Sequence, residues 1–247
     1  MSQRRPYAPL AVLGFVVAVA AVLLAIAAGF GTRWGLWDYR MGFTLLRWAA
    51  WTGLGAAGVA LIGCFTAPSG GPRRGLGLAA AGVVTGLLVF AVPTSNLHAA
   101  RSVPPINDIT TDPANPPAFV AILPLRKGAR LPPGYPGAKT AELQKKAYPD
   151  IAPARLSEPP NQAFARALAA ARALGWQIVA SVPGEGRIEA VDRTFWFGFS
   201  DDVVIRVAVD GNGSRVDIRS HSRVGRSDTG TNARRVRAFL REIAPIP

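Results

Sequence analysis

The sequence has few charged residues and few of the side chains from which metal and disulfide sites are built. Only 17% of the 247 residues are Asp, Glu, Lys or Arg, and there are one Cys and two His. Cys64 alone cannot close an intrachain disulfide, and one Cys with two His cannot complete a usual structural zinc site. We therefore expect neither a metal site nor a cofactor.

Acidic residues are almost missing from the first hundred positions, which contain seven Arg, no Lys and a single acid, Asp38. Three uncharged stretches of 27, 25 and 26 residues lie in this part of the chain. Each exceeds the roughly 20 residues that a helix needs to cross a bilayer core. The sequence predicts three membrane spans with cores at Leu10–Ala28, Trp48–Ala67 and Leu76–Pro93. None of the cores contains an acid or a lysine, which argues against a transporter with an ionisable relay.

The first apolar stretch has an alternative interpretation as a cleaved signal peptide. Arg4 and Arg5 precede it, and Ala25-Ile26-Ala27 resembles a small-residue cleavage site. Its apolar region of about 20 residues is longer than the 7 to 15 typical of signal peptides. This length favours a membrane span, and the question of cleavage stays open.

The distribution of Arg predicts the orientation, because cytoplasmic loops close to spans are enriched in Lys and Arg. Arg4, Arg5, Arg73 and Arg74 lie on one side of the predicted anchor, and Arg33, Arg40 and Arg47 lie on the other. We expect a cytoplasmic N-terminus in a bacterial inner membrane. Three crossings then place everything after His98 in the periplasm or another extracytoplasmic space.

Small residues four positions apart predict close contacts between membrane helices. They either pack the three spans together, which we favour, or form a homodimer. The pairs are Gly82 with Gly86, Gly14 with Ala18, and Gly53 with Ala57.

After the anchor, residues 1–98, comes a Pro-rich region over residues 99–160. Frequent Pro prevents long regular elements, so this region is predicted to be a linker or a segment wrapped over the following domain. Only Phe119–Leu125 resembles a strand, and Lys139–Lys146 resembles a short helix. The cations Arg126, Lys127 and Arg130 are predicted to be solvated, and the alternative is that an anionic lipid surface attracts them.

Residues 161–247 show the periodicities of a folded α+β domain. Apolar residues at helical spacing predict helices over residues 161–174 and 229–243, and alternation predicts strands between them. The expected fold is an antiparallel four-stranded sheet in two layers, with both helices on one sheet face. The predicted strands cover residues 176–182, 187–197, 202–210 and 214–224, with Trp176, Ile178, Ala180 and Val182 of the first on one side.

Period two separates an apolar face of this sheet from a polar face. One interpretation of the polar face is a solvated surface with cross-strand charge pairs. In the other, Arg206, Arg219 and Arg223 bind a carboxylate or phosphate, because guanidinium groups recognise such anions bidentately. The polar set comprises Glu189, Arg206, Arg215, Asp217, Arg219, His221 and Arg223.

A second candidate binding region lies where the last strand gives way to the last helix. Ser227, Asp228 and Asn232 are polar residues at this junction, where free N–H groups can receive an anion. Capping of the helix by Asp228, Thr229 or Thr231 is the simpler interpretation.

Two other classes of function have weaker support in the sequence. Ser220, His221 and Ser222 are adjacent, but on a regular strand both serines point away from the histidine, and there is no Gly-x-Ser-x-Gly elbow. No nucleic-acid-binding signature accompanies the excess of basic residues. We therefore assign no catalytic residue and expect no nucleic-acid partner.

The C-terminal motifs resemble the bacterial and plastid family known as domain of unknown function 1499, over roughly residues 104–243. The resemblance implies a membrane-tethered domain without an established activity, and it supplies no catalytic residues. Ile106–Asp112 fits the opening of that family. The other matching motifs are Arg187-Ile188-Glu189-Ala190, the run from Phe197-Gly198-Phe199 to Arg206, Val216-Asp217-Ile218-Arg219-Ser220, Ser222-Arg223-Val224-Gly225, Ser227-Asp228, Gly230, Asn232, Ala233 and Arg237.

We therefore expect a non-enzymatic envelope protein. Its anchor lies in the lipid bilayer, and its domain binds an anionic lipid, a small anionic ligand or a membrane-protein partner. The alternatives are an envelope hydrolase with a polar Ser/Asp/His site and a structural subunit of a membrane complex.

Overall fold

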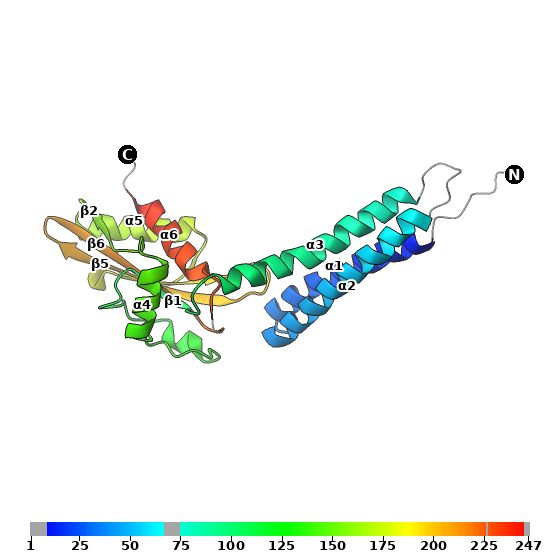
Figure 1. The fold of residues 1–247 in the computed structure, drawn as a ribbon. Helices are drawn as coiled ribbons and strands as arrows, with labels where there is room; N and C mark the ends of the chain where they lie inside the picture. The colour runs from blue at the N-terminus through cyan, green and yellow to red at the C-terminus, as the bar shows by residue number, and fades with distance from the viewer. Residues whose placement is uncertain (1–8, 67–74, 226, 245–247) are drawn as a thin grey trace. The chain divides into compact units, whose positions relative to one another are not determined.

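The computed structural model describes residues 9–66, 75–225 and 227–244 (Figure 1). The chain forms two compact units. The first comprises residues 1–98 together with Phe195–Gly198, and the second comprises residues 99–194 and 199–247.

Three long helices make up most of the first unit: α1 (Pro9–Arg33), α2 (Tyr39–Thr66) and α3 (Leu76–Arg101). All three are long and apolar enough to cross a membrane, so the prediction of three candidate spans is confirmed. The predicted end of the second span, Ala67, and the orientation markers Arg4, Arg5, Arg73 and Arg74 lie outside the described residues. Orientation therefore stays a prediction.

Glycines lie where the helices of the first unit approach most closely. A Cβ on Gly14 of α1 would meet the backbone of Ala60 in α2, and a Cβ on Gly86 of α3 would meet the carbonyl oxygen of Gly53 in α2. Small residues let helix backbones come together where no hydrophobic driving force acts between them. These glycines pack the helices of one chain against each other.

The second unit is built on a six-stranded antiparallel sheet in the order β1-β6-β5-β4-β3, with β2 also paired to β6. The prediction of four strands was wrong, because β1 and β2 have three residues each and so show no recognisable alternation. The strands are β1 (Asp108–Thr110), β2 (Ala154–Leu156), β3 (Gln177–Val182), β4 (Arg187–Arg193), β5 (Ser200–Asp210) and β6 (Gly213–Ser222).

Helices α5 (Pro160–Ala173) and α6 (Thr231–Ile243) pack on one face of this sheet (Figure 1). Phe164 of α5 and Phe239 of α6 join Ile188, Ile205 and Ile218 of the central strands in one buried apolar core. The predicted helix-covered apolar face is therefore present. A further helix, α4 (Ala138–Ala147), matches the short helix predicted in the Pro-rich region.

Residues 112–135, which we name the covering segment, contribute to the opposite face of the sheet. Phe119 and Ile122 pack there on Val191 and Val204. The strand predicted at Phe119–Leu125 was wrong, because its backbone forms the 3-10 helix η1 (Leu123–Arg126). A second 3-10 turn, η2 (Pro183–Glu185), connects β3 to β4.

A β-bulge corrects the alternation predicted for the first long strand. Ile178 pairs with Ala190, whereas Ala180 pairs with the adjacent Glu189, and the register shifts between them. Neighbouring residues of a strand point to opposite faces. Ile178 and Ala180 therefore do not share a face, contrary to the prediction.

We predict that Gly86→Leu destabilises the first unit, because the new side chain must displace the backbone of Gly53. Overpacking of this kind costs about 1–3 kcal/mol. Thermal unfolding of the full-length protein in detergent, followed by size-exclusion chromatography, should show a lower midpoint. Gly77→Leu on the same helix is the control, since among the described residues no atom outside its own helical turn lies within 4 Å of its Cβ position. Equal midpoints for the two variants would contradict this packing.

Candidate functional site

The polar face predicted from the alternation is present, but it is buried rather than solvated. The register aligns Asp108 of β1, His221 of β6 and Asp202 of β5 across the sheet. Their exposed fractions are 0%, 2% and 0%. The covering segment separates this row from water, so each carboxylate on it requires a partner inside the protein.

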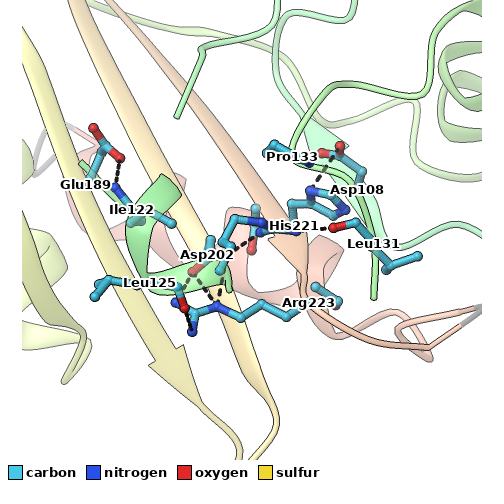
Figure 2. A network of polar contacts seen from close by, with 12 residues as sticks. Asp108, Ile122, Leu125, Leu131, Pro133, Glu189, Asp202, His221 and Arg223 are labelled. Atoms are coloured by element: carbon cyan, nitrogen blue, oxygen red, sulfur yellow. Dashed lines mark hydrogen bonds and ion pairs between the residues drawn. The ribbon is translucent and has the colours of Figure 1, made fainter. Parts of the chain in front are cut away.

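Asp202 is paired with two guanidinium groups, one from the covering segment and one from the residue after β6. The first belongs to Arg126, which is only 7% exposed, so the prediction that this cation is solvated was wrong. Arg126 of η1 contacts Asp202 Oδ2, and Nη2 of Arg223 donates to Oδ1 over 2.7 Å. Arg223 also donates through Nη1 to the carbonyl oxygen of Leu125, 3.0 Å away (Figure 2). The carboxylate thus joins β5, the end of β6 and η1.

Asp108 forms a bidentate pair with Arg219. Nε and Nη2 of Arg219 donate to the two carboxylate oxygens over 2.9 and 2.7 Å. The guanidinium carbon lies 4.8 Å from the ring centre of Phe119 and 5.6 Å from that of Tyr135. Burial raises the pKa of Asp108 despite Arg219, and burial together with Asp108 raises the pKa of Tyr135 to about 12.

His221 lies between these two pairs and is neutral. Burial, followed by the positive charges of Arg126 and Arg219, lowers its pKa to about 3. Its Nδ1 points toward Asp108 Oδ2 at 3.6 Å (Figure 2), and Nδ1 has no hydrogen-bond partner in the described part of the chain. A charged imidazole would add a third cation beside the guanidinium groups of Arg126 and Arg219.

The side chain of Glu189 forms hydrogen bonds with the backbone of the covering segment. Its carboxylate accepts N–H groups of Val120, Ala121 and Ile122 over 3.1, 2.9 and 2.9 Å, and it also pairs with Arg187. Sequence reasoning placed Glu189 on the polar face but missed this role. The available signal was a single acid in the otherwise apolar run Ile188-Glu189-Ala190-Val191.

The structure places Arg206, Arg219 and Arg223 on the same face, as predicted, but each contacts a different buried carboxylate. Arg206 pairs with Asp217 at 2.8 Å and with Asp112 at 3.1 Å. Removing one partner of a buried pair costs about 3–5 kcal/mol. Replacing all three arginines would therefore destabilise the fold, so a loss of binding in such a variant would not identify a binding site.

Ser227, Asp228 and Asn232 form a separate group on the helix side of the sheet. Asp228 accepts the N–H groups of Gly230 and Asn232, both over distances below 3 Å, and thereby occupies the start of α6. Burial raises the pKa of Asp228 against these two hydrogen bonds. The N-cap residue of α6 is Gly230, which has no capping side chain, so the prediction that Asp228, Thr229 or Thr231 is the N-cap was wrong. Asp228 instead accepts the N–H of Asn232 from two positions before the N-cap.

The side chain of Asn232 also forms hydrogen bonds with two serines of β6. Its Oδ1 accepts from Ser220, and its Nδ2 donates to Ser222. Both serines thus face α6, whereas His221 faces the covering segment, as the alternation predicted. Among the described residues there is also no cluster of His, Cys, Asp and Glu able to hold a metal ion.

The outer side of the covering segment exposes aliphatic side chains next to cations. Val120, Leu123 and Leu125 are 52%, 43% and 52% exposed, and Lys127 and Arg130 next to them are also exposed. The backbone N–H of Arg130 donates to the backbone carbonyl of Arg223, so these two basic residues are neighbours in the fold. We name these residues the cover patch: Val120, Leu123, Leu125, Lys127, Arg130 and Arg223.

We predict that His221→Gln reduces the loss of stability in acid. The unfolded chain takes up a proton near pH 6.5, whereas folded His221 stays neutral down to about pH 3. Its contribution is therefore complete above pH 6.5 and is lost as the pH falls toward 3. Between pH 7 and pH 5 this amounts to about 2 kcal/mol.

Pulse proteolysis of the full-length protein in urea at both pH values measures this difference. Carboxylates with raised pKa, such as Asp108, contribute equally to both proteins and cancel in the comparison. A variant that lost as much stability between pH 7 and pH 5 as the original protein would show that His221 is not a buried neutral group.

Comparison with known proteins assigns most of the second unit, together with the loop Phe195–Gly198, to one protein family. A family model described as a protein of unknown function (DUF1499) matches residues 108–243, more than half of the chain. The match begins with β1 and ends with α6. A search of curated proteins gives no match. The resemblance suggested by the sequence motifs is confirmed, and the chain belongs to the DUF1499 family of proteins of unknown function.

Proposed function

We propose that the protein is a membrane-anchored, non-enzymatic binding module whose C-terminal unit binds an anionic lipid headgroup. The observation that carries this proposal is the cover patch, where three exposed aliphatic side chains lie beside exposed cations. Aliphatic side chains exposed together beside cations are typical of surfaces that meet a bilayer.

The charges within and beneath the patch support an anionic ligand. Arg126, Arg219 and Arg223 face two carboxylates, Asp108 and Asp202, and His221 is neutral, which leaves a surplus of one positive charge. Arg126 Nε and Tyr135 Oη, both buried, also have no hydrogen-bond partner within the described chain. A phosphate near Lys127, Arg130 and Arg223 would be attracted by these three cations and by the surplus positive charge.

The location follows the predicted orientation. With the N-terminus in the cytoplasm of a bacterium, the second unit lies in the periplasm or another extracytoplasmic space, next to the outer leaflet of the inner membrane. The three candidate spans supply the membrane association.

The test uses the full-length protein and phosphatidylglycerol, an anionic lipid, with phosphatidylcholine for comparison. The variant Leu123→Ser, Leu125→Ser, Lys127→Gln, Arg130→Gln changes only exposed residues of the patch. Each basic residue near an anionic surface contributes about 1 kcal/mol, so losing two should weaken phosphatidylglycerol binding about 30-fold. Native mass spectrometry in a lipid titration measures the bound lipid.

The matched control removes the same kinds of groups elsewhere. Lys145 and Lys146 of α4 are exposed, and Val209 of β5 is 73% exposed. Lys145→Gln, Lys146→Gln, Val209→Ser should retain the lipid. Equal phosphatidylglycerol binding by both variants, or equal binding of the two lipids by the original protein, would refute the proposal.

A further inference from the structure

The connection between β4 and β5 contains a loop of three consecutive aromatic residues, Phe195, Trp196 and Phe197, followed by Gly198. Two hydrogen bonds close its base: Thr194 N–H donates to the carbonyl of Phe199, and Phe199 N–H donates to Thr194 Oγ1, each over 2.9 Å. The closed base makes Phe195–Gly198 a compact, aromatic loop.

These four residues belong to the first unit, with the candidate membrane helices. Trp196 occupies the space next to Gly29 of α1, where a Cβ would overlap its indole ring. Nη1 of Arg33, the last residue of α1, donates to the carbonyl of Phe195 over 2.8 Å. The loop is thus fixed at the end of a candidate span.

The outermost ring of the loop is left largely uncovered. Phe195 is 78% exposed, although its ring meets Phe30 edge-on at 5.6 Å. Trp34, one residue after the end of α1, is 70% exposed. Both aromatic rings lie beside Arg33, which is also exposed.

We infer that the loop Phe195–Gly198 inserts into the headgroup layer of the bilayer at the end of α1. Aromatic rings favour this layer at the ends of membrane helices. Arg side chains beside them extend their charge toward lipid phosphates while their stems stay in apolar surroundings. The partner of this surface is the bilayer interface, which would cover the exposed ring of Phe195.

A single nitroxide label measures the depth of the loop. The background is Cys64→Ser, which removes the one cysteine of the chain, and Phe195→Cys introduces the labelling site in the full-length protein. Phe195 is outside the apolar cores, so this change should leave the fold intact. The protein is placed in nanodiscs of phosphatidylethanolamine and phosphatidylglycerol.

Two further sites calibrate the measurement. Leu13→Cys lies within the predicted core of the first span, in the N-terminal part of α1, and is 51% exposed, so its label should meet lipid. Val209→Cys is 73% exposed on β5. At each site, collision of the label with oxygen, which concentrates in lipid, is compared with collision with a water-soluble nickel chelate. The label at 195 should shift toward the oxygen-preferring ratio of position 13 and away from that of position 209.

A nickel-accessible label at 195, matching position 209, would overturn the inference. A label at 195 shielded from both reagents would overturn it as well, because it would show that protein covers the site. The inference is independent of the proposed lipid-binding function. Repeating the measurement in the four-residue variant of the cover patch separates the two, since the loop label should keep its depth there even if lipid binding is lost.

Discussion

The burial of carboxylates on one face of the sheet is the constraint on which the C-terminal unit depends. Asp108, Glu189 and Asp202 are completely buried, and Asp217 is 1% exposed. An ion removed from water loses several kcal/mol of hydration unless charged or N–H partners replace the water. The strands β4, β5 and β6, the 3-10 helix η1 and the rest of the covering segment supply such partners, so they are held in one arrangement.

This constraint explains how a Pro-rich segment without long regular structure is ordered. Glu189 accepts three of its backbone N–H groups. In the opposite sense, Arg219 donates to the carbonyl oxygens of Pro117 and Pro133. The sheet therefore provides the hydrogen bonds that a helix or strand would have supplied within the segment itself.

Local patterns in the sequence predict the parts of the fold that depend on local physics. The turn Gly211-Asn212 joins β5 to β6 between the strands predicted at residues 202–210 and 214–224, and Gly211 has a positive φ of 60° that suits a tight hairpin. Alternation also assigned His221 and Ser220 to opposite faces. The four-stranded sheet was wrong because β1 is too short to show a period, and it is stabilised by pairing with the distant β6.

The candidate site was predicted only in part for the same reason. The arginines of the polar face follow from period two, but their carboxylate partners come from far along the chain: Asp108 for Arg219, and Asp112 for Arg206. No spacing in the sequence indicates such pairs. The exposure of Leu123 and Leu125 depends on the 3-10 turn of η1, which their apolar character alone does not indicate.

The second unit is not a continuous piece of the chain, because one of its loops belongs to the unit of the candidate membrane helices. The backbone passes between the two units after residue 98, and again on either side of Phe195–Gly198. A fragment beginning at residue 99 would therefore carry an aromatic loop that belongs to the other unit, and would expose it to water. Transplanting this domain onto a foreign anchor would meet the same difficulty. The anchor and the domain are expected to be exchangeable only as a matched pair.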